Sequence, residues 1–459
     1  MKQLKAFLKR IKLSNCLTMK IKFFRLANGL RIILIPREDF ESLTFFLYFK
    51  YGSFYEEKKE SGLAHFLEHL IFAGSQNFPE RKKVLDELEK ISAIFNGGTS
   101  FDFSYFYIKV LEKYKEQALF ILADLIKNPL FRKEDIEKEK KIILEEIRLS
   151  EDDYLGKCLE NLLETLFPNK NWGRRIIGFP ETITAFNQKN ILQAYTNYYT
   201  AKNSILVVIG KINNFKKLLE LIDRNFKGLK RGKEKNLGEF NLKPSFNLKI
   251  SQNQVNQTYF ALGTFEKIKN FEEYLKERGF LYLIIMNRIL GEGNNSRLFL
   301  KIREELNLAY IIKSDLIIFP KHLIFYIQTG LKKENYLEGI KAILEELIRI
   351  KKEGFTKEEI KTAYESILDN FLLDWENAFR VSRIYAYSYL YYFKDFKPRD
   401  LKKFVLKILG KKLAYDEINK KIKNFLQRPF SFSLIIPQGE NKNKIEKFIK
   451  KSIKIMTKE

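Results

Sequence analysis

Two spacings of apolar residues alternate along this chain and predict strands and helices in turn. Short runs in which apolar and polar positions alternate, or compact apolar runs, indicate strands, and longer runs with apolar residues three and four positions apart indicate helices. Residues 96–100, which include Gly97 and Gly98, predict a turn. The predicted strands lie at residues 21–36 (a pair joined at Asn28-Gly29), 44–50, 101–110 and 204–209, and the predicted helices lie at 85–94, 115–127, 133–150 and through much of 157–200.

The second half of the chain repeats this pattern. Phe106-Tyr107-Ile108, a helix and the segment 133–136 return as Phe325-Tyr326-Ile327, a helix over 335–350 and the segment 357–360. The offset is 219 residues at the tyrosines (326 minus 107) and 224 at the later isoleucines (360 minus 136). We therefore predict an α+β fold of two homologous α/β-roll halves, each an antiparallel-rich mixed sheet packed with helices, joined by a linker.

Candidate chemistry is concentrated at His65-Phe66-Leu67-Glu68-His69. The chain has three histidines, and two of them lie here at i and i+4, where a helix places both imidazoles on one face. Glu68 lies on nearly the same face. Imidazole nitrogens bind zinc and a neighbouring carboxylate can take a proton from metal-bound water, so the His-x-x-Glu-His order predicts an inverzincin site. The alternative interpretation is an amphipathic core helix whose histidines only hydrogen-bond to their neighbours.

A zinc site of this kind needs a third protein ligand. The candidate is Glu146, which lies two helical turns from Glu139 on one face. Glu139 could then contact a metal ligand without binding the metal itself. Glu145 is the alternative. At the offset of 224, an alanine and an asparagine replace Glu139 and Glu146 in the second half, so one half is predicted to bind metal and the other is not. His322, in an apolar strand, is interpreted as structural.

A polar, glycine-bearing stretch supplies the boundary between the halves. The predicted organisation is a basic N-terminal extension at 1–18, a catalytic zinc-binding domain at 19–227, a linker at 228–248, a second domain without metal at 249–440 and a lysine-rich C-terminal helix at 441–459.

Cysteine content, apolar runs and charge each exclude a class of protein. Two cysteines, Cys16 and Cys158, exclude a disulfide framework and predict a reducing, cytoplasmic location. No apolar run approaches the roughly 18 residues of a transmembrane segment, so none is predicted. The formal charge of +26 is spread along the chain without a nucleic-acid-binding motif, and no nucleic-acid partner is predicted. The alternative is a basic nucleic-acid-binding protein that also carries zinc. Its binding to nucleic acid would fall steeply as the salt concentration rises.

Three segments carry a family resemblance. They are the run from Tyr51-Gly52-Ser53 through His65-Phe66-Leu67-Glu68-His69, the segment 136–147 around Glu146, and the segment 296–310 with Arg303 and Ala309-Tyr310. Together they resemble the pitrilysin/insulinase family of zinc metallopeptidases, especially half-length members such as the mitochondrial processing peptidase and its bacterial relatives. Asn96-Gly97-Gly98-Thr99 is similar to the family's Asn-Ala-x-Thr substrate strand, with Gly97 where alanine is usual. The resemblance spans roughly residues 19–440.

The resemblance implies a zinc-dependent endopeptidase with one Zn²⁺ per chain. His65, His69 and Glu146 would hold the ion, and Glu68 would act as the general base on the zinc-bound water. The substrates implied are unstructured peptides or small polypeptides.

The resemblance also implies a two-subunit chamber. In half-length members, the positions of Arg303 and Tyr310 act on substrate from the second domain of the facing subunit, Tyr310 at the oxyanion and Arg303 in orienting the peptide. The peptide would add as a strand to Asn96-Gly97-Gly98-Thr99. The expected partner is a second copy or a related subunit, giving a homodimer or a heterodimer. The alternative function is a non-catalytic or partner-dependent subunit of a heterodimeric peptidase.

Overall fold

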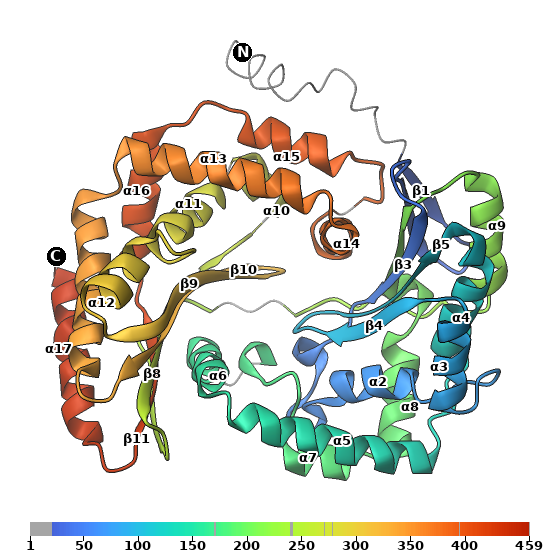
Figure 1. Cartoon of the computed structure of the whole chain (residues 1–459), viewed down its shortest axis with the longest axis horizontal. Coiled ribbons are helices and arrows are strands. Elements are labelled where there is room, and N and C mark those ends of the chain that lie inside the picture. Colours follow the sequence, from blue (N-terminus) through green and yellow to red (C-terminus); the bar gives the residue numbers. More distant parts are fainter. Residues whose placement is uncertain are drawn as a thin grey trace. The chain divides into compact units, whose positions relative to one another are not determined.

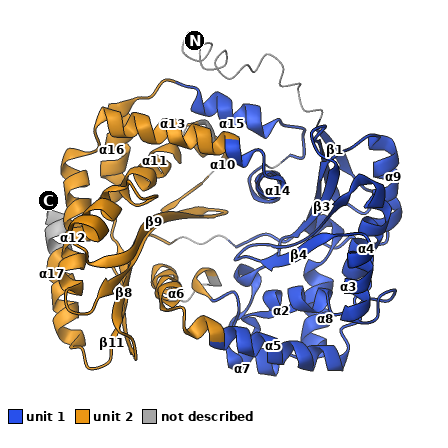
Figure 2. Ribbon diagram, viewed as in Figure 1, with its two compact units in different colours: residues 1–148, 175–239, 373–411 blue, residues 149–174, 240–372, 412–459 orange. Residues whose placement is uncertain are grey.

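The described part of the chain folds into two compact units, each a sheet with helices packed on it (Figures 1 and 2). The computed structural model describes residues 21–168, 171–238, 242–269, 271–277, 279–393 and 395–458, and the predicted extension at 1–18 lies outside them. Unit 1 comprises residues 1–148, 175–239 and 373–411, and unit 2 comprises 149–174, 240–372 and 412–459. Two mixed sheets, each packed with helices, confirm the predicted fold class.

Unit 1 is built on a mixed six-stranded sheet with the order β1-β2-β6-β3-β5-β4. β1 and β2 form the predicted hairpin at Asn28-Gly29, β2 pairs in parallel with β6, and the other neighbours are antiparallel. β4 is the last of the described strands on its side of the sheet. The strands are β1 (Lys22–Arg25), β2 (Arg31–Pro36), β3 (Ser42–Phe49), β4 (Ile94–Thr99), β5 (Ser104–Leu111) and β6 (Ser204–Gly210).

Alternation along the strands gives this sheet two apolar faces. Phe45 and Leu47 of β3 point into the main core, where the helices of the first half pack. Phe46 points to the other face, where Phe379 of α14 lies against it with ring centroids 5.9 Å apart. The helices of unit 1 are α2 (Leu63–Ile71), α3 (Arg81–Lys90), α4 (Lys115–Lys127), α5 (Lys133–Glu151), α7 (Pro180–Ala185), α8 (Gln188–Tyr198), α9 (Phe215–Phe226), α14 (Ala378–Tyr387) and α15 (Leu401–Leu409), with a π-helical turn η7 (Ser388–Tyr392).

The predictions at the β4 edge need correction. The helix predicted at 85–94 is α3, which ends at Lys90, and residues 96–99, predicted as part of a turn, belong to strand β4. Glycine is required at positions 97 and 98 because side chains from elsewhere in the sequence lie close to the backbone there. A Cβ at Gly98 would lie 2.5 Å from the ring of Tyr105, and one at Gly97 would lie 2.9 Å from the carboxylate of Glu68. Close approach of other groups to a strand requires glycine just as a turn does, and the sequence alone does not separate the two cases.

Unit 2 is built on a five-stranded sheet with the order β7-β11-β8-β10-β9, in which β7 and β11 are parallel and the other pairs antiparallel. α6 lies on this sheet, with Tyr154 stacked on Tyr259 of β8. α16 also packs on it, with Phe425 against Phe325 of β10. The elements are α6 (Tyr154–Leu166), β7 (Leu248–Asn253), β8 (Gln257–Lys267), α10 (Phe271–Lys276), α11 (Leu281–Leu290), the π-helical turn η6 (Phe299–Glu305), β9 (Ala309–Phe319), β10 (His322–Lys332), α12 (Tyr336–Glu353), α13 (Lys357–Asp374), α16 (Tyr415–Leu426), β11 (Ser431–Pro437) and α17 (Lys442–Lys458).

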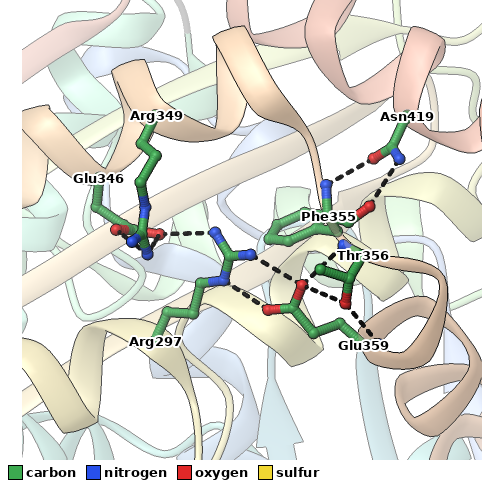
Figure 3. Close-up of polar contacts among 7 residues, drawn as sticks. All are labelled: Arg297, Glu346, Arg349, Phe355, Thr356, Glu359 and Asn419. Carbon is green, nitrogen blue, oxygen red and sulfur yellow. Dashed lines mark hydrogen bonds and ion pairs between the residues drawn. The ribbon is translucent and has the colours of Figure 1, made fainter.

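An ion-pair cluster around Arg297 joins three segments of unit 2 (Figure 3). Arg297 Nε donates to Glu359 Oε1 at 2.7 Å, and its Nη1 donates to Glu346 Oε1 at 3.0 Å. The guanidinium also lies over the ring of Phe355, 4.8 Å from the centroid. Arg349 pairs with the other oxygen of Glu346 at 2.8 Å. The chain entering η6 is therefore tied to both α12 and α13 by charge-assisted hydrogen bonds.

The two units are not the two sequence halves, because each half contributes a helical segment to the sheet of the other (Figure 2). Residues 149–174, which contain α6, pack in unit 2, and residues 373–411, which contain α14 and α15, pack in unit 1. These segments begin at Leu149 and Leu373, which are 224 residues apart (373 minus 149). This separation equals the offset of the sequence repeat, so the two halves exchange equivalent segments.

The connection predicted as a linker at 228–248 packs on unit 1 over part of its length. Its described residues 228–238 form neither helix nor strand. Glu234 lies 2.8 Å from the buried Lys50 Nζ, and the Lys235 N–H donates to Asn203 Oδ1 at 2.9 Å. Burial lowers the pKa of Lys50, and the charge of Glu234 opposes this effect. Glu234 thus supplies the counter-charge for a buried cation of unit 1.

Candidate metal centre

The helix α2 carries the His-x-x-Glu-His segment, and its N-terminus is held by a buried carboxylate. Its apolar face, including Phe66 and Leu70, is buried in the core of unit 1, which leaves His65 and His69 on the other face. Glu56 accepts hydrogen bonds from the Gly62 N–H at 2.9 Å and the Ala64 N–H at 2.7 Å. A carboxylate at this end accepts hydrogen bonds from N–H groups that have no partner within the helix, and its negative charge interacts favourably with the positive end of the helix dipole. The family resemblance included Glu56, but its role is visible only in the folded chain.

Three ligand atoms converge at one point of unit 1. His65 Nε2 lies 3.7 Å from Glu146 Oε2, and His69 Nε2 lies 3.6 Å from the same oxygen. The two imidazole centroids are 4.7 Å apart. Four-coordinate zinc with ligand distances of about 2.0–2.1 Å places its ligand atoms about 3.3 Å apart. The two separations from Glu146 exceed this value by a few tenths of an ångström, and all three ligand atoms lie within 4.8 Å of one another, so the three side chains suit a tetrahedral metal ion.

The helix α5 brings Glu146, and not Glu145, to this point. Glu145 is 64% exposed and pairs with Arg148 on the outer face of α5. Glu146 is 38% exposed and faces both histidines. Adjacent residues on a helix are separated by about 100°, so only one of the two carboxylates can face α2.

Glu139 lies behind His69. Its Oε2 is 3.2 Å from His69 Nδ1, and its side chain is only 1% exposed. Because a carboxylate accepts hydrogen bonds, the proton at this contact belongs to Nδ1, which leaves Nε2 of His69 free for a metal. The other carboxylate oxygen of Glu139 pairs with Arg81, at the start of α3. Sequence reasoning missed Arg81, since nothing in its local sequence indicates that it meets α5.

The pKa values of the two histidines are shifted in opposite directions. Burial, with a smaller contribution from His69, lowers the pKa of His65 to about 3, so its imidazole is neutral and able to bind a metal. Burial also acts to lower the pKa of His69. The bond to Glu139 and the charges of Glu146 and Glu68 outweigh that effect and raise the pKa above its usual value.

Glu68 lies between the metal-binding face of α2 and the edge strand β4. Its Oε2 accepts a hydrogen bond from Thr99 Oγ1 at 3.1 Å. Burial raises the pKa of Glu68, while the charge of His69 and the Thr99 bond oppose the rise. A raised pKa makes this carboxylate a stronger base than a free glutamate, which suits it to accept and return a proton.

The remaining predicted residues lie on β4 and in unit 2. Asn96, Gly97, Gly98 and Thr99 lie on β4, the terminal strand of the unit 1 sheet, beside Glu68. Arg303 and Tyr310 lie together in unit 2, where Arg303 Nη1 donates to the Tyr310 carbonyl at 3.0 Å and Tyr310 is 75% exposed. The structure thus brings together the predicted residues of unit 1, and separately those of unit 2.

Comparison with known families gives two matches along the chain. Residues 31–179 match the model of insulinase (peptidase family M16), and residues 185–367 match the family's model of the peptidase M16 inactive domain. The first match contains the histidines and Glu146. The second covers most of the half in which the equivalents of Glu139 and Glu146 are replaced.

Similar proteins carry related names. An uncharacterized zinc protease of Rickettsia bellii is 29% identical over 84% of this chain and 91% of its own length. An uncharacterized zinc protease of Bacillus subtilis is 27% identical over 78% of this chain and 85% of its own. Among solved structures, a protease from Helicobacter pylori has a TM-score of 0.80 at 22% identity and covers 91% of this chain and 100% of its own. The first half of the periplasmic protease PqqL from Escherichia coli has a TM-score of 0.73 at 20% identity, with 96% of this chain and 97% of that one covered.

The helices in the described part of the chain were also compared with the length and apolarity that a membrane crossing requires. None of them meets both conditions.

Proposed function

The chain belongs to the insulinase family of peptidases, family M16, and we propose that it is a zinc-dependent endopeptidase that cleaves unstructured peptides or small polypeptides. The observation that carries the proposal is the convergence of His65 Nε2, His69 Nε2 and Glu146 Oε2 within 4.8 Å of one another, with Glu68 beside them. Two imidazole nitrogens and one carboxylate form a ligand set that zinc accepts, with a position left for water or substrate.

In the proposed mechanism, Glu68 moves the proton. Bound zinc would supply Lewis acidity, which lowers the pKa of a water molecule and polarises the peptide carbonyl. Glu68 takes the proton from the attacking water and delivers it to the leaving amine. Thr99 holds one oxygen of Glu68 at 3.1 Å, which orients the carboxylate. Glu139 fixes the ring of His69 through Nδ1.

The substrate would bind as an additional strand along β4. Among the described strands β4 pairs with β5 alone, and so it can pair with an extended peptide on its other side. Because Gly97 has no Cβ, the backbone of β4 lies close against Glu68, so a peptide paired with β4 would pass near that carboxylate. Main-chain pairing predicts a loose sequence preference.

We further propose that Arg303 and Tyr310 contact the substrate from a second subunit in a two-chain chamber. Tyr310 is exposed and contacts the half-buried Arg303 in unit 2, whereas the proposed ligands belong to unit 1. The partner would be a second copy of the chain or a related subunit.

Hydrolysis of a mixed peptide library tests the proposal, with wild type, Glu68→Gln, Glu146→Gln and Glu145→Gln compared. Wild type and Glu145→Gln should cleave and hold about one zinc per chain, Glu68→Gln should hold zinc without cleaving, and Glu146→Gln should lose both. Zinc binding without cleavage in wild type would favour the alternative, a partner-dependent or non-catalytic subunit. Absence of zinc binding in wild type would refute the metal site.

A further inference from the structure

Arg81 pairs with Glu139, the buried carboxylate that also contacts His69. Its Nη2 forms an ion pair with Glu139 Oε1 and also lies 3.4 Å from the main-chain carbonyl of His69. Arg81 is the first residue of α3, and Glu139 lies 58 residues later on α5. The side chain of Arg81 thus links α3 to α5 and to the last turn of α2.

The two oxygens of Glu139 have different partners. Oε2 faces His69 Nδ1 at 3.2 Å, and Oε1 faces Arg81. Since Glu139 is 1% exposed, water does not replace either partner at low cost. Without Arg81, one buried oxygen would lose its donor, and the carboxylate would be free to rotate away from the imidazole.

We propose that Arg81 is a positioning residue of the metal site: it holds the Glu139 carboxylate in the plane that receives His69 Nδ1–H, and so directs His69 Nε2 toward Glu146. The inference rests on the proposed function, because it concerns the affinity of that site for zinc. Partners behind a metal-binding histidine typically contribute 10–100-fold in metal affinity.

The test is zinc affinity, measured by competition with a chromophoric chelator. Arg81→Gln should weaken zinc binding by roughly 10–100-fold, and Arg81→Lys, which keeps the charge, should recover part of the loss. The matched control is Arg148→Gln, which removes an arginine that pairs with Glu145 on the exposed face of α5 and should leave affinity unchanged.

A double variant separates positioning from a general loss of structure. If Arg81 acts through Glu139, the variant Arg81→Gln/Glu139→Gln should bind zinc no more weakly than Glu139→Gln alone. Losses that multiply in the double variant, or wild-type affinity in Arg81→Gln, would overturn the inference and leave the proposed function intact. A wild-type chain that binds no zinc would overturn both.

Discussion

The carboxyl group of Asp102 makes the stability of unit 1 depend on pH in the direction opposite to that of most acidic groups. Asp102 lies between β4 and β5 and is 3% exposed. Its carboxylate accepts a hydrogen bond from Tyr387, and the Tyr391 hydroxyl donates to its main-chain carbonyl. Burial raises the pKa of Asp102 to about 7, although the Tyr387 bond and the charge of Arg383 act to lower it.

The free energy follows from the two pKa values. Between pH 3.8, where the carboxyl ionises in the unfolded chain, and about pH 7, the folded chain keeps a proton that the unfolded chain has lost. The unfolded state binds fewer protons in this range, so stability falls as pH rises and levels off above pH 7. At about 1.4 kcal/mol per pH unit the total is on the order of 4 kcal/mol, of which about 2.5 kcal/mol falls between pH 5 and pH 8.

Asp102→Asn removes this titration and keeps the shape of the side chain. Wild type should lose about 2.5 kcal/mol of stability between pH 5 and pH 8 through this titration, and the variant should not. The free energy of unfolding of the variant minus that of wild type should therefore rise by about 2.5 kcal/mol over this range. Urea unfolding measures it, in a Trp172→Phe background that leaves Trp375 of unit 1 as the single tryptophan reporter. The control is Asp39→Asn, an exposed aspartate paired with Arg37. A difference between Asp102→Asn and wild type that stays constant across this pH range would refute the reasoning.

Two further substitutions, one in each unit, test individual contacts. In Gly97→Ala, the new Cβ would start 2.9 Å from Glu68 Oε1, so we expect kcat/KM to fall roughly tenfold with zinc content unchanged. Gly228→Ala, with open space around its Cβ, is the control, and wild-type activity in Gly97→Ala would contradict the prediction. In unit 2, His322 is buried against Phe265 and Trp172, and within the described residues neither of its ring nitrogens has a hydrogen-bond partner. Replacing it in His322→Phe should raise the free energy of unfolding by about 1–2 kcal/mol in a urea titration, and a less stable variant would count against this account.

Features governed by local periodicity were predictable from the sequence. The spacing of His65 and His69 places both rings on one face of any helix, and the seven-residue spacing of Glu139 and Glu146 does the same on α5. The face shared with Glu139 favoured Glu146 over the adjacent Glu145, and in the structure it is Glu146 that faces the histidines. The offset of 224 likewise predicted two related halves, and the two sheets with their helices confirm the fold class.

Features that depend on contacts distant in sequence came only from the tertiary structure. The ion pair between Arg81 of α3 and Glu139 of α5 joins residues 58 positions apart in the sequence. Residues 149–174 and 373–411 each pack on the sheet of the other half. The helices in these segments would need an apolar face on either sheet, so the sequence does not reveal the exchange. At Gly97, a requirement for space beside Glu68 looks in sequence like a turn signal. Hydrophobic periodicity states which face of an element is buried, whereas the partner that buries it is determined only when the elements pack together.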